Sequence, residues 1–239
     1  MLCANLKGRS AAPNRKHRLA VAAVAALVLA AAVVFFVSLG GEAPPEIGDI
    51  IEFGGKGWLV LDVQEGGLFE SHRVLIITQD IIGQRTYHGR WTSITWETND
   101  IRNYLNNDFY GRFTAEERQR IAQTAVANYD NPWFGTPGGN DTTDKIFLLS
   151  LDELVKYFGD SGQLAHRNHP DNQPWRGFHD RYTGVRVAYS AEGPGWWWLR
   201  SPGFYYDNAA NVVSDGFVAV GGLVLINSGG VRPALWLYI

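Results

Sequence analysis

The 239-residue chain is almost free of cysteine, because Cys3 is the only one. A disulfide needs two cysteines and a thiolate metal site needs several, so neither can hold the part of the chain after Cys3 together. A hydrophobic core must therefore stabilise the fold. Material for it is plentiful, since nine Trp, ten Tyr and twelve Phe residues supply large apolar areas. From Glu46 onward the chain is long enough for a domain that buries roughly 70% of its unfolded surface.

Charge is absent from one long stretch, residues 19–39. An apolar run of this length can cross the roughly 30 Å hydrocarbon core of a bilayer as a helix. Basic residues precede the run and acidic residues follow it, and basic flanks stay on the cytoplasmic side. The sequence thus predicts a single-pass protein of the cell membrane, with the N-terminus in the cytoplasm. Its parts would be a basic cytoplasmic tail (1–18), a transmembrane helix in the lipid bilayer (19–39), a linker (40–49) and an extracytoplasmic domain (50–239).

A cleaved signal peptide is the alternative interpretation of the same stretch. Ser38 and Gly40 would then be the small residues at the cleavage site. The apolar region of a signal peptide usually spans only 7–15 residues, which favours the uncleaved anchor. Both interpretations place the domain outside the cytoplasm.

Basic residues are scarce in that domain. Five of the 21 Lys and Arg residues and none of the 24 Asp and Glu residues precede Glu42, which leaves 16 against 24, a net charge of −8. Such a surface has no electrostatic footprint for phosphate backbones, so nucleic acid is not an expected partner.

Sequence motifs of catalysis are missing as well. The chain has no nucleophile elbow, no phosphate-binding loop and no carboxylates paired at helical or strand spacing. We therefore expect no enzyme and no cofactor. An enzyme of another kind stays open as an alternative, with His166, His169 and His179 as its metal ligands. The alternative for these histidines is a solvated loop. Asn140–Asp144 gathers oxygens that suit calcium, but Asx residues capping their own backbone are the commoner reason for such runs.

The order of the expected elements indicates an α+β fold. A hairpin is expected at 58–63 and 73–78, with strands at both ends of the domain and helices between them. Helices are expected around Asn99–Phe109, after the Thr114–Glu117 capping box, and from the Ser150–Glu153 capping box until Gly159. The expected later strands are 145–149, 196–200, 210–214, 217–221, 223–226 and 231–238.

Four motifs in order carry a resemblance to known proteins. They are Trp96-Glu97…Asp100-Ile101-Arg102…Tyr104-Leu105-Asn106…Phe109-Tyr110, Asp141-Thr142…Asp144-Lys145-Ile146-Phe147-Leu148-Leu149-Ser150, Trp198-Leu199-Arg200-Ser201-Pro202-Gly203 and Gly229-Gly230-Val231-Arg232-Pro233-Ala234-Leu235. Together they resemble a bacterial exported or membrane-anchored domain family. That family in turn is similar to the C-type-lectin-like fold of formylglycine-generating enzymes and of variable proteins of diversity-generating retroelements.

The resemblance implies a C-type-lectin-like fold with an irregular, ligand-facing C-terminal region. It does not carry over an activity. The cysteines of formylglycine-generating enzymes are missing from this domain, and so are the Glu-Pro-Asn, Gln-Pro-Asp and Trp-Asn-Asp motifs of calcium-dependent lectins.

Residues 203–230 contain no Lys, Glu, Gln, Met or Trp, although these types make up 32 of the 239 residues. Asn codons mutated at adenine by a diversity-generating retroelement cannot yield those five types, so the segment is a candidate for such diversification. The alternative is that apolar β-strands lack most of them in any case.

The same segment is the expected binding surface for a protein or other macromolecular ligand. Aromatic and small polar side chains give a rigid contact area with adaptable hydrogen bonding. We expect one contiguous exposed patch on a frame held by Trp198, Arg200, Arg232 and Trp236, with Trp197 in the core or, alternatively, exposed to a ligand. A structural cell-envelope module without an exposed aromatic patch is a further alternative. The expected contact residues are Phe204, Tyr205, Tyr206, Asp207, Ser214, Phe217, Leu225, Ile226, Asn227 and Ser228.

Overall fold

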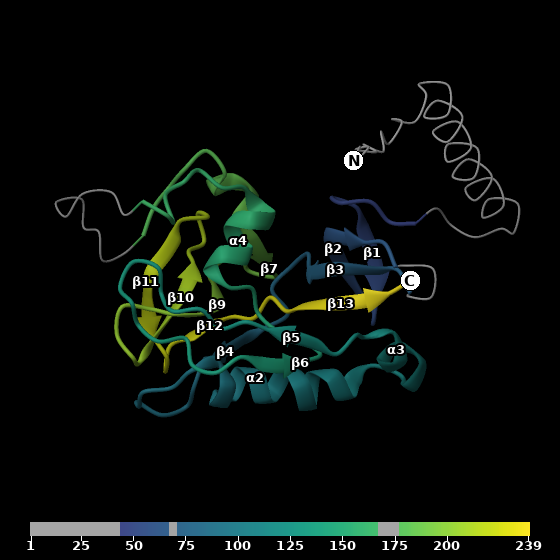
Figure 1. The fold of residues 1–239 in the computed structure, drawn as a ribbon, viewed down its shortest axis with the longest axis horizontal. Helices are drawn as coiled ribbons and strands as arrows, with labels where there is room; N and C mark the ends of the chain where they lie inside the picture. Colours follow the sequence, from purple (N-terminus) through teal and green to yellow (C-terminus); the bar gives the residue numbers. More distant parts are fainter. Residues whose placement is uncertain (1–43, 67–70, 167–176) are drawn as a thin grey trace, which may run out of the picture. The chain divides into compact units, whose positions relative to one another are not determined.

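Strands from the two ends of the domain meet in one antiparallel sheet. The computed structural model describes residues 44–66, 71–166 and 177–239. The sheet has the order β1-β2-β3-β13, with the last strand beside the third (Figure 1). Its strands are β1 (Ile50–Phe53), β2 (Lys56–Gln64), β3 (Arg73–Thr78) and β13 (Ala234–Tyr238). The expected hairpin is confirmed, because β2 and β3 pair antiparallel with Leu59 opposite Ile77.

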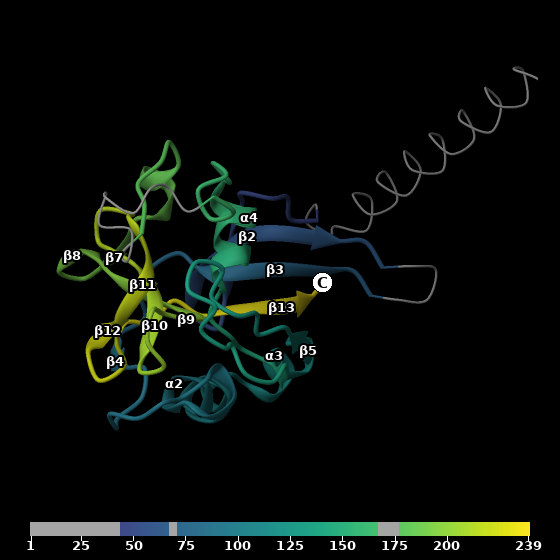
Figure 2. The ribbon, with the colours of Figure 1, turned by 60° about the vertical axis from the view of Figure 1, so that its left-hand side comes forward.

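A second, five-stranded sheet carries most of the C-terminal part. Its order is β11-β10-β9-β12-β4, and every pair is antiparallel except β12 with β9. Figure 2 shows this sheet beside the first one. Its strands are β4 (Gln84–Thr86), β9 (Trp197–Pro202), β10 (Asn208–Val212), β11 (Val218–Val224) and β12 (Ser228–Gly230). Two small hairpins, β5 (Thr124–Val126) with β6 (Thr142–Asp144) and β7 (Ala188–Ser190) with β8 (Gly193–Gly195), complete the strands of the described residues.

The helices start where capping residues predict and end early. Both expected capping boxes form, so Thr114 and Ser150 begin α3 (Ala115–Arg120) and α4 (Leu151–Phe158). Gly159, with φ +104°, ends α4 as expected. Helix α2 (Asp100–Tyr104) lasts five residues and then passes into a π-helical turn, Leu105–Phe109, and a 3-10 turn, Tyr110–Arg112. Further 3-10 turns are Trp96–Thr98 and Thr183–Arg186.

The predicted α+β, C-type-lectin-like fold class is wrong, because the domain is mainly β. Strands hold 35% of the described residues and helices 19%. The structure differs from the expectation in two respects. The expected helices break after one or two turns, and several three-residue strands form in segments that look like loops. Hydrogen bonds between distant segments create those strands, and a local pattern does not reveal them.

The membrane span expected at 19–39 lies outside the described residues. Within 44–66, 71–166 and 177–239, no helix has both the length and the apolar content needed to cross a membrane.

The strand expected at 145–149 is also corrected. Residues 146–149 are buried, but only Phe147 makes a strand-like bridge, with Ala234. Strands β9, β10, β11 and β13 match the other C-terminal expectations within a few residues, with 217–221 and 223–226 joined in one strand.

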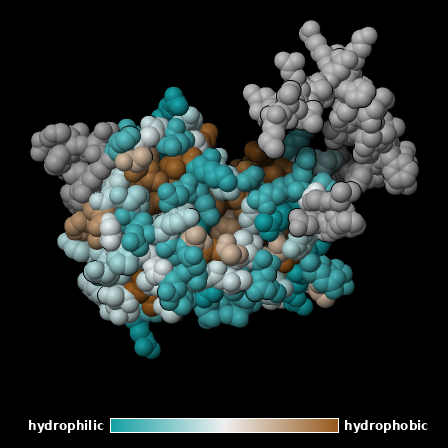
Figure 3. Space-filling model, viewed as in Figure 1, coloured by the Kyte–Doolittle hydropathy of each residue, from teal (hydrophilic) through white to brown (hydrophobic). Residues whose placement is uncertain are grey.

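Large aromatic side chains fill a core shared by both sheets. Trp58, Trp96, Trp197 and Trp198 are all fully buried. The core interpretation of Trp197 is thus confirmed, and the ligand-facing alternative is wrong. Trp196 and Trp198 share a face, with ring centroids 4.8 Å apart. On the face shown in Figure 3, hydrophilic residues cover most of the surface, and hydrophobic residues form separate patches between them.

Candidate functional site

Two loops at one end of the five-stranded sheet enclose a groove of about 630 Å³. One loop follows β4, and the other is the turn from β9 to β10. We call this space the aromatic groove. It is lined by Trp91, Thr92, Ser93, Tyr205, Tyr206, Asp207, Asn208 and Val224.

Hydrogen bonds fix the two loops to each other. The indole Nε1 of Trp91 donates to the carboxylate of Asp207, and the Ile94 backbone N–H donates to the Tyr206 carbonyl at 3.2 Å. The Leu225 backbone N–H donates to the Asp207 carbonyl at 3.0 Å. The groove is therefore held together by bonds between segments that are far apart in the sequence.

A bulge between β10 and β11 lies next to the two strand residues that line the groove. The register of the two strands shifts between Ala209 and Asn211. Opposite this point Gly222 has φ +69°, and a Cβ there would lie 2.0 Å from the Ala209 carbonyl oxygen. Only glycine fits this backbone without strain. Beyond the bulge, Val224 pairs with Asn208, and both line the groove.

The groove is unusually rich in exposed aromatic rings. Trp91 is 71% exposed, and Tyr205 and Tyr206 are each 61% exposed. Phe204, 37% exposed, anchors the turn by packing edge-on against Phe134, with ring centroids 4.7 Å apart. Because Trp is highly buried on average, an indole this exposed calls for an explanation other than folding.

The ten residues expected in one contiguous patch do not form one, and this expectation is corrected. Phe204, Tyr205, Tyr206 and Asp207 lie at the groove end of β10. Leu225, whose N–H bonds to Asp207, is followed by Ile226 and Asn227 in the turn and by Ser228, the first residue of β12. Ser214 and Phe217 lie in the turn between β10 and β11, at the other end of the strand. Five strand residues separate these ends by roughly 17 Å.

Burial changes the set further. Ile226, Asn227 and Ser228 are exposed, as expected, whereas Leu225 is 1% exposed and belongs to the core. Strands β10 and β11 are largely buried as well. That burial gives a physical basis to the alternative for residues 203–230, namely that apolar strands lack Lys, Glu and Gln.

The opposite end of the hairpin holds a smaller polar cluster. His179 Nε2 lies 3.1 Å from the Asp215 carboxylate, and the His179 ring packs on Phe217 at 4.8 Å. The Phe217 backbone N–H and, to a lesser degree, His179 keep the pKa of Asp215 below its usual value. These bonds account for the cluster as the stabilisation of a turn.

Trp91, Thr92, Ser93, Asn208 and Val224 were not among the expected contact residues. A signal for the first three exists in the sequence, since Trp91 stands in the polar run Gly89-Arg90-Trp91-Thr92-Ser93 without an apolar period. A Trp in such surroundings is a candidate for exposure. Its position beside Asp207, 116 residues later in the chain, has no local signal.

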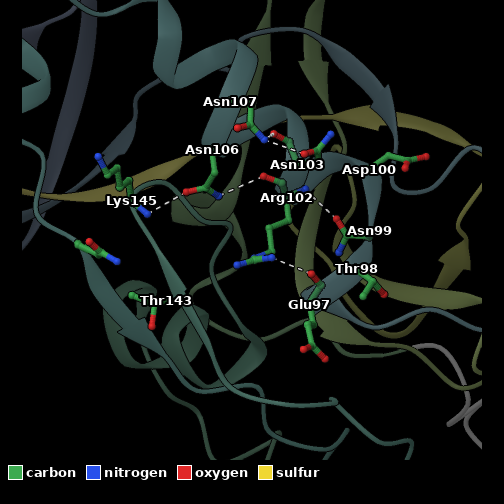
Figure 4. A pocket seen from close by; sticks show the side chains of 11 residues that line it. Glu97, Thr98, Asn99, Asp100, Arg102, Asn103, Asn106, Asn107, Thr143 and Lys145 are labelled. Carbon is green, nitrogen blue, oxygen red and sulfur yellow. Dashed lines mark hydrogen bonds between the residues drawn. The ribbon is translucent and has the colours of Figure 1, made fainter. Parts of the chain in front are cut away.

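A polar pocket of about 580 Å³ beside α2 is the other candidate (Figure 4). Several of its side chains form hydrogen bonds with neighbouring groups of the chain. Arg102 donates to the Glu97 carbonyl and to the buried Asp144 carboxylate, each at 2.7 Å. Asn106 accepts the Lys145 backbone N–H at 2.8 Å and donates to the Ile146 carbonyl at 2.8 Å. These bonds join α2 and the π-helical turn after it to β6 and to the segment that follows β6, so these side chains stabilise the fold.

Both arginines of the expected frame are buried. Arg200 donates to the carbonyls of Leu148 and Ala127, at 2.8 and 3.0 Å, and forms a two-pronged pair with the Glu153 carboxylate. Arg232 donates to the Thr78 carbonyl at 2.8 Å and lies against the Trp197 ring. Burial lowers the pKa of Arg232 to about 10. Trp198 and Trp236 are buried as well.

The metal-binding alternatives find no assembled site in the described segments. His169 lies outside them, and the described residues contain no group of three or more His, Cys, Asp or Glu that could hold a metal ion. In the 140–144 run, Asp141 accepts the Asn128 backbone N–H at 2.9 Å, and Asp144 accepts the Thr142 hydroxyl at 2.8 Å. Both carboxylates thus bind groups of the chain itself.

Comparison with known proteins identifies a family. Residues 71–239 match the family described as "Domain of unknown function (DUF6273)", and since the match covers more than half of the chain, the chain belongs to that family. No curated protein and no solved structure matches it.

Proposed function

We propose that this member of the DUF6273 family is a recognition protein that binds a protein ligand in the aromatic groove. The observation that carries the proposal is the exposure of Trp91, Tyr205 and Tyr206 around one carboxylate, Asp207. Trp and Tyr dominate the residues that contribute most to binding at protein interfaces. Aromatic surface that stays in water adds little to the hydrophobic core.

The surroundings of the groove suit binding because they are fixed. The Trp91–Asp207 hydrogen bond and the backbone bonds at Tyr206 and Leu225 hold both loops before a ligand arrives. Tyr and Trp side chains also have few rotatable bonds, so little conformational entropy is lost when a ligand immobilises them. Binding to a groove prepared in this way costs less free energy than ordering a mobile loop.

The exposed rings also favour recognition over a purely structural role in the cell envelope. A module that only fills space would be expected to lack an exposed aromatic patch. Here the rings gather on two loops that leave the sheet at the same end, which is where binding residues commonly lie on a rigid scaffold.

Peptide and glycan arrays probed with the full chain test the proposal. We expect the wild type to select peptides and the Tyr206→Ala variant to bind them at least about tenfold more weakly, as for a contact residue that contributes strongly to the interface. Tyr189→Ala is the matched control, because Tyr189 is 53% exposed and does not line the groove. It should bind like the wild type.

Two outcomes would contradict the proposal. One is that no peptide is selected. The other is that Tyr206→Ala and Tyr189→Ala bind the selected peptides equally well. Selection of glycans alone, with binding weakened by Tyr206→Ala, would overturn the protein ligand while leaving the groove as the site.

A further inference from the structure

We propose that the aromatic groove accepts a positively charged group, the ammonium or guanidinium of a Lys or Arg side chain on the ligand. The inference rests on the proposed function and names the chemistry that the groove recognises. It follows from three features of the described residues, which are the charge of Asp207, the rings around it and the charge of the whole domain.

Asp207 has room for a cationic partner. The ion pairs of the described residues join Asp62, Asp100, Asp144, Glu153, Asp180 and Asp215 to their partners and leave Asp207 out. The Asp207 carboxylate accepts the indole N–H of Trp91. The side-chain amide of Asn208 donates to the other Asp207 oxygen at 2.9 Å. An ionised carboxylate offers about four acceptor positions, so these two bonds leave about two for a ligand.

Aromatic rings stabilise a cation at the same place. Trp91, Tyr205 and Tyr206 line the groove together with Asp207. A cation over the face of a Trp or Tyr ring is attracted by the ring's quadrupole, and Trp gives the strongest attraction. The fold uses this contact in its own packing, since the Arg85 guanidinium lies 3.6 Å from the centroid of Tyr104.

The charge of the domain acts in the same direction. With 16 basic and 24 acidic residues, the part of the chain from Glu42 onward carries a net charge of −8. Such a surface attracts basic ligands and speeds their association. A neutral sugar could stack on the same rings but would gain nothing from the charge of Asp207. A cationic side chain uses all three features.

Choline and its uncharged isostere 3,3-dimethylbutan-1-ol separate these cases. We would titrate each into the isotope-labelled full chain and follow the indole N–H resonance of Trp91 by NMR. Choline should shift this resonance with a dissociation constant on the order of millimolar, and the isostere should bind at least about tenfold more weakly.

Variants assign the preference to the groove. Asp207→Asn keeps the shape and an acceptor for Trp91 but removes the negative charge that attracts the choline cation, so choline binding should weaken about tenfold while the isostere is unaffected. Asp108→Asn is the matched control, because Asp108 is an exposed carboxylate that does not line the groove. It should leave both affinities unchanged.

The outcomes distinguish this inference from the proposed function. Equal affinities for choline and its isostere would overturn the proposal that the groove binds a cation. So would an unchanged Trp91 indole resonance at a choline concentration about ten times the expected millimolar dissociation constant. Array peptides that bind through the groove but lack Lys and Arg would also overturn the cationic ligand, but they would leave the proposed function intact. If no array peptide binds through the groove, both the proposed function and the cationic ligand are wrong.

Discussion

Replacing Arg200 by Met is expected to lower the free energy of unfolding by about 3–5 kcal/mol, because it leaves the carboxylate of Glu153 without its partner. The Arg200 side chain is 3% exposed and that of Glu153 is 28% exposed. The guanidinium also bonds to the carbonyls of Leu148 and Ala127, which hold α4 and the strand β5 region against β9. Urea unfolding followed by tryptophan fluorescence measures the change.

A control variant separates this effect from the loss of any surface charge. Arg112 is exposed, and Arg112→Met should change the free energy of unfolding by no more than about 0.5 kcal/mol. If Arg200→Met were equally mild, the buried pair would not hold the frame. The double variant Arg200→Met, Glu153→Gln should recover part of the loss, since no charge is then left without its partner and a Gln at this position still completes the capping box with Ser150.

Asp144→Asn is expected to lower the free energy of unfolding by about 3 kcal/mol, near the lower end of the range for broken buried pairs. The carboxylate is fully buried and accepts three donors, Trp96 Nε1 at 2.8 Å, the Thr142 hydroxyl at 2.8 Å and Arg102 Nε at 2.7 Å. An amide has one oxygen, so its NH2 group must face at least one donor. Arg102 is 26% exposed and can regain water, which limits the cost.

The same urea titration measures Asp144→Asn, and Asp108→Asn serves as its control. Asp108 is exposed and belongs to the π-helical turn. We expect a change within about 0.5 kcal/mol for the control. Equal stabilities of the two variants would show that the three hydrogen bonds to the buried Asp144 carboxylate do not stabilise the fold.

Local chemistry made parts of the fold readable from the sequence. A capping box is complete within four residues, so Thr114 and Ser150 marked helix starts correctly. Gly159 marked a helix end for the same reason. The hairpin of β2 and β3 was readable because β-branched and apolar runs pair across a short connection. Such signals do not reach beyond their own segment, which is why the fold class was misjudged. The single residue Phe147, bridged to Ala234 across 87 positions, illustrates the limit.

Only part of the candidate site could be predicted from the sequence, for a similar reason. The turn at Phe204–Asp207 was predicted from its composition, and its rings are exposed. Direction along a strand decided the rest. Ser214 and Phe217 follow in the same segment, yet β10 carries them to the opposite end of the sheet. Trp91 is held at the groove by hydrogen bonds to the 204–207 turn, its own to Asp207 and that of Ile94 to Tyr206, which no sequence pattern indicates.

One NMR measurement tests the central claim, that the aromatic groove is where the ligand binds. A peptide selected on the array is added to the labelled full chain, and backbone and indole shifts are followed across both ends of the β10–β11 hairpin. We predict that the largest shifts fall on Trp91, Tyr205, Tyr206 and Asp207, while Ser214 and Phe217 stay unchanged. Largest shifts at Ser214, Phe217 and His179 would contradict the account.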